Sequence, residues 1–528
     1  QQKPRQPGPR WGHQCQRKFG RGFASVLGQP AVAMSSAPSR LGPTLVLAAL
    51  GACLLSGLGQ LYRIDQHRCP DWPSLRANLA AAVTFGVAVA LLSIAWLRWL
   101  RQSKSPDGPS TRAVLACAAI LYVLAGLGPP ALSDDPLFYA AIGRALAGGH
   151  SPAQPLCQSL PPDDALLQLL VPHWRCGNSA YLAGFHAVAS IIAAVAKNDL
   201  VWHLRGHQIV AGLSMLGGAG LTALALRGSS LRPAYGAVLV ALNPLSIVEA
   251  AGNAHNDALL ALATGGLVLA YSRRHLGGTL LSAGLALSVK ASAVLVALFL
   301  PAASALRWLR RRVGPPSSHL HTLGLAVAAL LGLILAGALL LHLRPVALFG
   351  PSHLPWEHCT RSLECLPRSI LRAILQKPEV AGYVAVGFRL LSAVWLAYAA
   401  YRAGESPSQR LAWMGAGLLI YYLYLHPWSQ SWYLLSLLPL SPWLRGRYSR
   451  ALRSLSISAT AYYALVFIGN CLQDELAIAV TDLIEGLIVM VPPTISLLRT
   501  ATPQPMAPAS LGASGPTLLG ATAPFPPR

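Results

Sequence analysis

The amino-acid sequence predicts an all-α, polytopic transmembrane protein with about 12–14 membrane helices. Hydrophobic residues make up 54% of its 528 residues and charged residues only 11%, and its mean hydropathy is +0.48. A soluble protein of this length would need far more charged surface. Lys and Arg gather in short segments between apolar stretches, which is the pattern of cytoplasmic loops. The net charge of +23 follows from this bias, and we expect no nucleic-acid partner.

Apolar stretches place the membrane helices along the chain. A spanning helix needs about 20 apolar residues, and somewhat fewer where polar residues flank it. We expect spans near residues 43–61, 79–97, 113–128, 200–226, 234–248, 258–271, 320–343, 381–401, 411–425, 432–444, 452–468 and 476–491. Both flanks of residues 276–306 are basic, so we expect a hairpin of two short helices that turns at Ser288-Val289-Lys290. Residues 181–196 fit a helix lying at the outer surface.

The two ends of the chain differ from its apolar middle. Residues 1–42 are basic and rich in Gly and Pro, which predicts a disordered segment. Two interpretations of this segment stand: sequence upstream of a start at Met34, or a tail that helps to fix orientation. Residues 43–495 form the predicted transmembrane domain. Residues 496–528 form a predicted disordered tail rich in Pro and Ala.

Two adjacent carboxylates, Asp134 and Asp135, follow the third predicted span. A charged side chain at a bilayer boundary is costly unless water solvates it or it has a function there. One interpretation is that one carboxylate is a general base with a raised pKa in a partly desolvated cleft, while the other orients it or holds a substrate hydroxyl. The alternative is structural, because an Asp just before a helix is a good N-cap and Pro136 begins a predicted helix.

A second polar island, residues 252–257, interrupts another apolar region. Asn243-Pro244 kinks or interrupts the preceding span, and Glu249 lies near the outer end of that span. His255, Asn256 and Asp257 offer donors and acceptors suited to sugar hydroxyls or to a phosphate. The alternative is a polar turn followed by an Asp N-cap. The spacing lacks a metal-ligand signature such as HExxH, so we assign no metal ligands.

Two further features fall on the same predicted outer side. Lys290 is a lone Lys inside an apolar hairpin, which is costly unless it snorkels or pairs with a phosphate or with a carboxylate such as Glu249 or Asp257. His426, Trp428 and neighbouring aromatic residues form a short loop. Such a loop suits either the face of a sugar ring or the membrane interface.

Nine Cys are too few for a disulfide scaffold. Cys157 and Cys176 fall in one long predicted outer loop, and Cys359 and Cys365 fall in another. Pairing within each loop fits an oxidising compartment, and the alternative is four unpaired thiols. The second loop, residues 344–377, also carries Arg side chains suited to lipid phosphates or to an acceptor.

These motifs resemble those of a known enzyme group. Residues 133–139, closing at 148–152, are similar to the first extracytoplasmic loop of bacterial GT-C glycosyltransferases. They resemble in particular the polyprenyl-phosphate-mannose-dependent alpha-mannosyltransferases of cell-envelope glycans. Asn243-Pro244 with residues 252–257 resembles the second motif of that group, an Asn-Pro followed by Gly-His-Asn-Asp, with Ala254 intruding here. Lys290 and the loop at His426 match further landmarks, and the resemblance covers about residues 113–440.

The resemblance implies a GT-C-like fold and an integral membrane glycosyltransferase. Such an enzyme moves a hexose, mannose in this group, from a polyprenyl-phosphate donor to a lipid-linked or glycan acceptor, with inversion. The implied location is the bacterial inner or plasma membrane, with an extracytoplasmic active site. The partners are then the donor, the acceptor and the bilayer. No cofactor is required by this chemistry, although the carboxylate pair could hold a divalent metal.

The same resemblance assigns roles to individual residues. Asp134 or Asp135 would be the catalytic base, with a weak preference for Asp135, and Lys290 and His255 would face the donor phosphate. The side chains expected to contact the sugar or the acceptor are those of Asn256, Asp257, His426 and Trp428.

A transporter or flippase of a lipid-linked or small anionic substrate is the alternative function. Broken helices and a buried Lys fit such a protein. A transporter should show the same hydropathy pattern in both halves of its chain. We find no such repeat, and the acidic motif occurs only once. A structural scaffold explains neither the one-sided polar islands nor the intramembrane Lys290.

Overall fold

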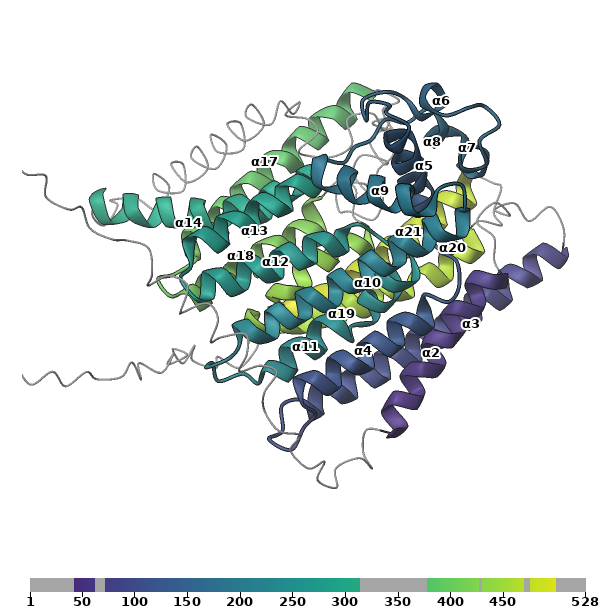
Figure 1. Ribbon diagram of the computed structural model, residues 1–528. Coiled ribbons are helices and arrows are strands. Elements are labelled where there is room, and N and C mark those ends of the chain that lie inside the picture. Colours follow the sequence, from purple (N-terminus) through teal and green to yellow (C-terminus); the bar gives the residue numbers. More distant parts are fainter. Residues whose placement is uncertain (1–41, 62–71, 314–377, 427–429, 470–474, 500–528) are drawn as a thin grey trace, which may run out of the picture. The chain divides into compact units, whose positions relative to one another are not determined.

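The computed structural model describes residues 42–61, 72–313, 378–426, 430–469 and 475–499. The chain divides into two units, residues 1–44 and 45–528, and the second contains all of the described residues except the first three of α2. The described residues confirm the all-α class. In chain order the helices are α2 (Gly42–Leu61), α3 (Trp72–Gln102), α4 (Thr111–Ala125), α5 (Asp135–Ala147), α6 (Leu156–Ser159), α7 (Ala165–Leu169), α8 (Pro172–Arg175), α9 (Ala183–Ala196), α10 (Leu200–Ala225), α11 (Pro233–Ala241), η2 (Ser246–Gly252), α12 (Asp257–Ser272), α13 (Leu276–Val289), η3 (Ala291–Ala293), α14 (Val294–Val313), α17 (Pro378–Arg402), α18 (Pro407–Ile420), η5 (Tyr421–Leu425), η6 (Ser431–Trp443), α19 (Gly446–Ala461), α20 (Tyr463–Gly469) and α21 (Glu475–Leu498) (Figure 1).

Several of these helices are long and apolar enough to cross a bilayer. Within the described residues they are Leu75–Gln102, Leu200–Ala225, Ala291–Trp308 and Gly446–Ile468, and α11 with η2 adds a fifth if this bent pair forms one span. Shorter apolar helices, among them α4, α9, α12 and α13, accompany them. The protein is therefore a polytopic helical membrane protein. The total of about 12–14 membrane helices stays a prediction, and the expected span at 320–343 lies outside the described residues.

The expected span at 234–248 is broken at Asn243-Pro244. α11 ends at Ala241 and η2 begins at Ser246, with a 60° bend between them. Pro244 lacks an N–H group and cannot continue the ladder of hydrogen bonds. The Asn243 amide replaces the lost contacts: its nitrogen donates to Ser456 Oγ at 3.0 Å, and its oxygen accepts from the Leu245 N–H at 3.0 Å. The predicted interruption is confirmed, and its consequence is to redirect the chain into η2.

A close crossing of α10 and α12 supports the start of α12. A Cβ added at Gly265 would lie 2.8 Å from the Gly218 carbonyl oxygen, so the two backbones approach too closely for a side chain there. Small residues at such crossings allow tight helix packing in membranes. This contact fixes the helix that begins at Asp257.

The hairpin expected at 276–306 breaks at the predicted place. α13 ends at Val289, and Lys290 has extended backbone angles (φ −154°, ψ 141°) before η3 and α14 begin. Lys290 pairs with Tyr181 in an isolated antiparallel bridge, and the Leu182 N–H donates to the Val289 carbonyl at 3.1 Å. The loop before α9 therefore holds the Lys290 break in place.

The stretch 181–196, expected as a surface helix, contains α9, and α5 packs against it. Figure 1 shows α5 to α8 gathered at one end of the longer helices. The predicted disulfide between Cys157 and Cys176 is present in this segment, and Arg144 forms a 2.8 Å ion pair with Asp164. The pair Cys359 and Cys365 and the loop 344–377 lie outside the described residues.

The expected α-helical span at 432–444 is instead the 3₁₀ helix η6. Pro439 and Pro442 lie inside it and lack N–H groups, so a regular α-helical ladder cannot form there. η6 packs against α12, and its first residues reach the polar groups described next.

Candidate active site

Asp135 is the first residue of α5, and its carboxylate faces the interior. Tyr139 lies one turn later on the same helix face, and its hydroxyl donates to Asp135 Oδ2 at 3.1 Å. The same oxygen lies 3.4 Å from Nδ1 of His255. Burial raises the pKa of Asp135, but the contacts with His255 and Tyr139 and the charge of Lys290 outweigh it and hold the pKa below its usual value. The pKa of Asp135 therefore favours the carboxylate, and its Oδ2 faces both Tyr139 and His255.

Asp134 differs from its neighbour. It occupies the N-cap position of α5, yet in the described residues its side chain makes no capping hydrogen bond, and the Ser133 hydroxyl accepts from the Asp135 N–H instead. Its Oδ1 is buried without a hydrogen-bond partner among the residues that the structure describes. Burial, followed by the charge of Asp135, raises the pKa of Asp134 to about 6. The capping alternative therefore does not account for Asp134.

His255 lies between two carboxylates. Its Nδ1 faces Asp135, and its Nε2 lies 3.4 Å from Oε2 of Glu249 on η2. The side chains of His255 and Glu249 are both fully buried. The imidazole also stacks on Trp432 at the start of η6, with 4.0 Å between ring centroids and 10° between ring planes. His255 thus joins three separate elements of the fold.

Lys290 and Asp257 form the second half of the cluster. The Lys290 ammonium lies 3.1 Å from Asp257 Oδ2 and 3.4 Å from Oδ1. It also lies 4.2 Å from the centre of the Tyr433 ring and 6.0 Å from that of Tyr181, within reach of cation–π attraction. The structural alternative for residues 252–257, in which Asp257 only caps a helix, does not account for this ion pair.

One polar cluster therefore joins segments that lie far apart in the chain. We call it the carboxylate–cation cluster, and its members are Asp134, Asp135, Tyr139, Tyr181, Glu249, His255, Asp257, Lys290, Trp432 and Tyr433. The Lys290 charge acts on Asp135, which connects its two halves electrostatically. The acidic motif, the polar island and Lys290 therefore meet in one place, and of the partners expected for Lys290 the structure shows Asp257.

The remaining predicted site residues lie around this cluster. Asn256 is buried, and within the described ranges neither its amide nitrogen nor its oxygen has a hydrogen-bond partner. His426 is buried, with its ring 5.0 Å from that of Tyr433. The Tyr433 ring is therefore a neighbour of both His426 and the Lys290 ammonium. Trp428 lies outside the described residues.

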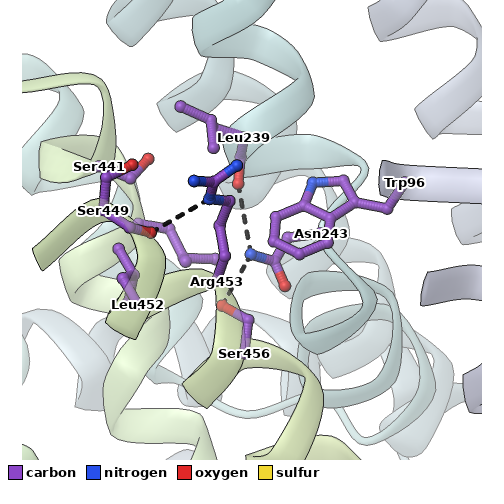
Figure 2. Close-up of a pocket in the computed structure, with 9 residues that line it drawn as sticks. Trp96, Leu239, Asn243, Ser441, Ser449, Leu452, Arg453 and Ser456 are labelled. Carbon is purple, nitrogen blue, oxygen red and sulfur yellow. Dashed lines mark hydrogen bonds between the residues drawn. The ribbon is translucent and has the colours of Figure 1, made fainter. Parts of the chain in front are cut away.

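A small cavity is lined by residues that do not belong to the cluster (Figure 2). It has a volume of about 10 Å³, which is room for about one water molecule. Figure 2 shows Arg453 Nε donating to Ser449 and the Asn243 amide donating to Ser456 and Leu239. Asn243, at the break between α11 and η2, lines this cavity. The candidate active site is the carboxylate–cation cluster, because that is where the ionisable groups converge.

Among the described residues, no group of three or more His, Cys, Asp and Glu side chains is arranged to hold a metal ion. Lys290 and His255 are the cluster's basic groups. The arrangement can bind an anion near Lys290 and can accept a proton at Asp134. These are the two chemical tasks of a displacement in which a phosphate departs.

Sequence reasoning did not assign roles to four of the aromatic residues. Tyr139 had a signal, because it lies four residues after Asp135 on a predicted helix. Trp432 and Tyr433 belong to the aromatic loop that the sequence singled out, but their contacts depend on how η6 packs. Tyr181 reaches Lys290 through a bridge between two loops, which no local pattern predicts.

Comparison with known proteins adds one match. The family model described as "Alpha-(1->6)-mannopyranosyltransferase, N-terminal domain" matches residues 42–306. These residues carry Asp134, Asp135, Glu249, Asp257 and Lys290. No curated protein and no solved structure matches the chain.

Proposed function

Because this chain belongs to the alpha-(1->6)-mannopyranosyltransferase family, and is therefore a glycosyltransferase, we propose that it transfers mannose from a polyprenyl-phosphate donor. The acceptor is a lipid-linked or glycan hydroxyl at the extracytoplasmic face of the membrane. The observation that carries this proposal is the Lys290 ammonium, which is held beside Asp257 and whose charge also acts on the carboxylate of Asp135. A cation and a carboxylate base are what transfer from a phosphate-linked sugar requires.

The proposed reaction is a single displacement. The acceptor oxygen attacks the anomeric carbon, the bond from that carbon to the phosphate oxygen breaks, and polyprenyl phosphate leaves with the electron pair. One displacement inverts the configuration. The acceptor proton passes to a carboxylate, and the departing phosphate gains negative charge near Lys290. Asn256, Asp257, His426 and Trp428 are proposed to contact the sugar or the acceptor.

The environments of the two adjacent carboxylates favour Asp134 as the base. A general base works best with a pKa near the operating pH, and that of Asp134 is about 6. Its Oδ1 lacks a hydrogen-bond partner within the described residues, whereas Asp135 is engaged by Tyr139 and His255. We therefore propose Asp134 as the proton acceptor and Asp135 as the anchor of His255, although the sequence alone favoured Asp135 weakly.

Lys290 is proposed as the main phosphate-binding group. Its side chain is 15% exposed, whereas that of His255 is fully buried with a carboxylate beside each ring nitrogen. His255, which lies between Asp135 and Glu249, is proposed to face the phosphate less directly. We propose that the Lys290 cation makes a divalent metal unnecessary, and transfer that persists in a chelator would support this.

The Cys157–Cys176 disulfide supports an extracytoplasmic address for the segment that contains α5. Disulfides persist in oxidising compartments and are rare in the cytosol. The basic segments, in turn, favour the cytoplasm. The active site and the disulfide would then lie outside, where a lipid-linked donor is available and a nucleotide sugar is not.

Donor choice tests this function. Purified protein in proteoliposomes is supplied with labelled polyprenyl-phosphate mannose or with labelled GDP-mannose, together with an extract of envelope glycolipids. We expect label in a glycolipid product only from the polyprenyl donor, and an inverted anomeric configuration by NMR. Transfer from GDP-mannose alone, or retention of configuration, would contradict the proposal.

A further inference from the structure

The position of Asp134 depends on its backbone. Within the described residues its side chain makes no capping hydrogen bond, and its Oδ1 is buried without a hydrogen-bond partner. A free oxygen is what a proton acceptor needs, but it cannot hold the side chain in place. The chain on either side of Asp134 must do so. On the C-terminal side, Asp135 begins α5 and faces Tyr139 and His255.

Asn253 connects the chain on the N-terminal side of Asp134 with the polar island. The Leu132 N–H donates to Asn253 Oδ1 at 3.1 Å, and Asn253 Nδ2 donates to the Val248 carbonyl at 3.0 Å. An N–H can only donate and a carbonyl can only accept, so these two partners fix the orientation of the amide. Capping of η2 accounts for the bond to Val248, but it does not account for the bond to Leu132.

Gln208 on α10 connects the same two segments a second time. Its Nε2 donates to the carbonyls of Gly128 and Gly252, each at 3.0 Å. Its Oε1 accepts from Arg205 Nη1 at 2.8 Å. Arg205 also donates to the three carbonyls that follow α4, and carbonyls at the end of a helix need such donors. Capping of α4 therefore does not account for the bond from Gln208 to Gly252.

We propose that Asn253 and Gln208 are positioning residues, which tie residues 128–132 to the polar island and so hold Asp134 in place in the carboxylate–cation cluster. We call these two side chains the polar clip. The catalytic consequence rests on the proposed function, in which Asp134 accepts the proton, but the clip itself can be tested without substrate. Neither side chain is a member of the cluster, so the clip acts through the backbone that carries Asp134.

Asn243 provides a matched control at the other end of η2. It is 1% exposed and Asn253 is 2% exposed. Its amide also donates and accepts, with Ser456 Oγ and the Leu245 N–H as partners, and neither partner belongs to residues 128–132. Asn253→Leu and Asn243→Leu each leave the partners of one buried amide unpaired, so they should cost comparable stability. Only the first should release the segment that leads to the acidic motif.

Hydrogen exchange in nanodiscs tests the clip without any substrate. We expect Gln208→Leu to speed exchange of the Leu132 amide by about tenfold or more, although Asn253, the acceptor of that amide, is unchanged. Asn243→Leu should leave the Leu132 amide at the wild-type rate. Wild-type exchange at Leu132 in Gln208→Leu would overturn the clip, and so would equally fast exchange in Asn243→Leu.

A second variant keeps the test open if Gln208→Leu does not yield folded protein. Asn253→Leu then decides through the Asp135 amide, which donates to Ser133 Oγ at 3.2 Å. Neither of these two partners is replaced, so faster exchange at Asp135 would report a released segment. Exchange of the Asp135 amide at the wild-type rate would overturn the clip.

The pH dependence of transfer tests the link to Asp134. Burial, followed by the charge of Asp135, raises the pKa of Asp134 to about 6, so a released segment that admits water should lower that pKa. We expect Asn253→Leu and Gln208→Leu to lower kcat about 10- to 100-fold, with little change in KM for the donor. The acidic limb of kcat/KM should move to lower pH. A merely structural loss would lower kcat and leave the limb in place.

Two kinetic results would overturn the positioning role. One is an acidic limb that stays at the wild-type pH in both clip variants, and the other is an equal displacement of the limb in Asn243→Leu. If the wild type transfers no mannose from polyprenyl-phosphate mannose, the proposed function fails. Exchange at the Leu132 amide still decides whether the clip holds the segment.

Discussion

The Lys290 ammonium lies 3.1 Å from a carboxylate oxygen of Asp257, and the two side chains are only 15% and 2% exposed. The pair joins the break between α13 and η3 to the first residue of α12. A buried ion pair contributes little net stability, but removing one partner leaves an uncompensated charge. The pair therefore holds a cation at the site in a defined position.

Replacing Lys290 by Met should destabilise the protein by about 3–5 kcal/mol, because Asp257 is left buried without its counter-ion. It should also abolish transfer. The double variant Lys290→Met with Asp257→Asn should recover most of the lost thermal stability but none of the activity. Thermal unfolding and transfer assays on both variants check this. Recovery of activity in the double variant would dismiss the phosphate role of Lys290.

The activity should depend on the protonation of Asp134. Its pKa is about 6, and a base must be deprotonated to act. We expect kcat/KM to be constant above that pH and to fall tenfold for each unit below it, as measured in a pH series with the polyprenyl donor. A flat profile between pH 5 and 7 would remove the base assignment.

Asp135→Asn should move this acidic limb to lower pH. The charge of Asp135 is one of the causes that raise the pKa of Asp134, after burial, so its removal lets Asp134 lose its proton at a lower pH. We expect residual activity, reduced at all pH values because His255 loses its anchor. A limb that stays in place or moves upward would mean that another group controls it.

The disulfide should stabilise the segment between α5 and α9. Cys157 and Cys176 are 19 residues apart, and closing a loop of this size is worth about 3 kcal/mol in the chain-entropy model. The double variant to Ser should show faster proteolysis within residues 148–182, compared under identical conditions. Thiol labelling of the native protein gives a control, because Cys53 and Cys117 are free. Labelling of Cys157 or Cys176 without reductant would contradict the disulfide.

Ala254→Gly should stabilise the protein. Ala254 has φ +58°, a left-handed conformation that costs a non-glycine residue about 1–2 kcal/mol. Glycine adopts it without that cost, although it loses more chain entropy on folding. We expect a small rise in the thermal unfolding temperature with transfer activity retained. Ala250→Gly, at a buried helical position in η2, is the matched control and should lower that temperature.

The sequence predicts the helical class and several boundaries because the local signals are strong. Pro244 breaks its helix for a covalent reason, and Lys290 marks a break because an ammonium cannot remain in hydrocarbon unpaired. The polar islands were placed on one side by the positive-inside rule, and Asp135 does meet His255. In these cases the local chemistry allows few arrangements.

Other features depend on packing that local patterns do not encode. Nothing in the sequence shows that Asp257, and not Glu249, pairs with Lys290, since both lie near the same end of neighbouring helices. The stack of His255 on Trp432 joins segments far apart in the chain. The choice between Asp134 and Asp135 also depends on tertiary burial, because the two residues are adjacent and chemically identical.

The most direct test compares the wild type with Asp134→Asn in the transfer of labelled mannose from polyprenyl-phosphate mannose. We expect the wild type to form a glycolipid product, and Asp134→Asn to bind the donor with unchanged Kd while forming no product. Product formation by Asp134→Asn at the wild-type rate would show that this carboxylate does not accept the proton.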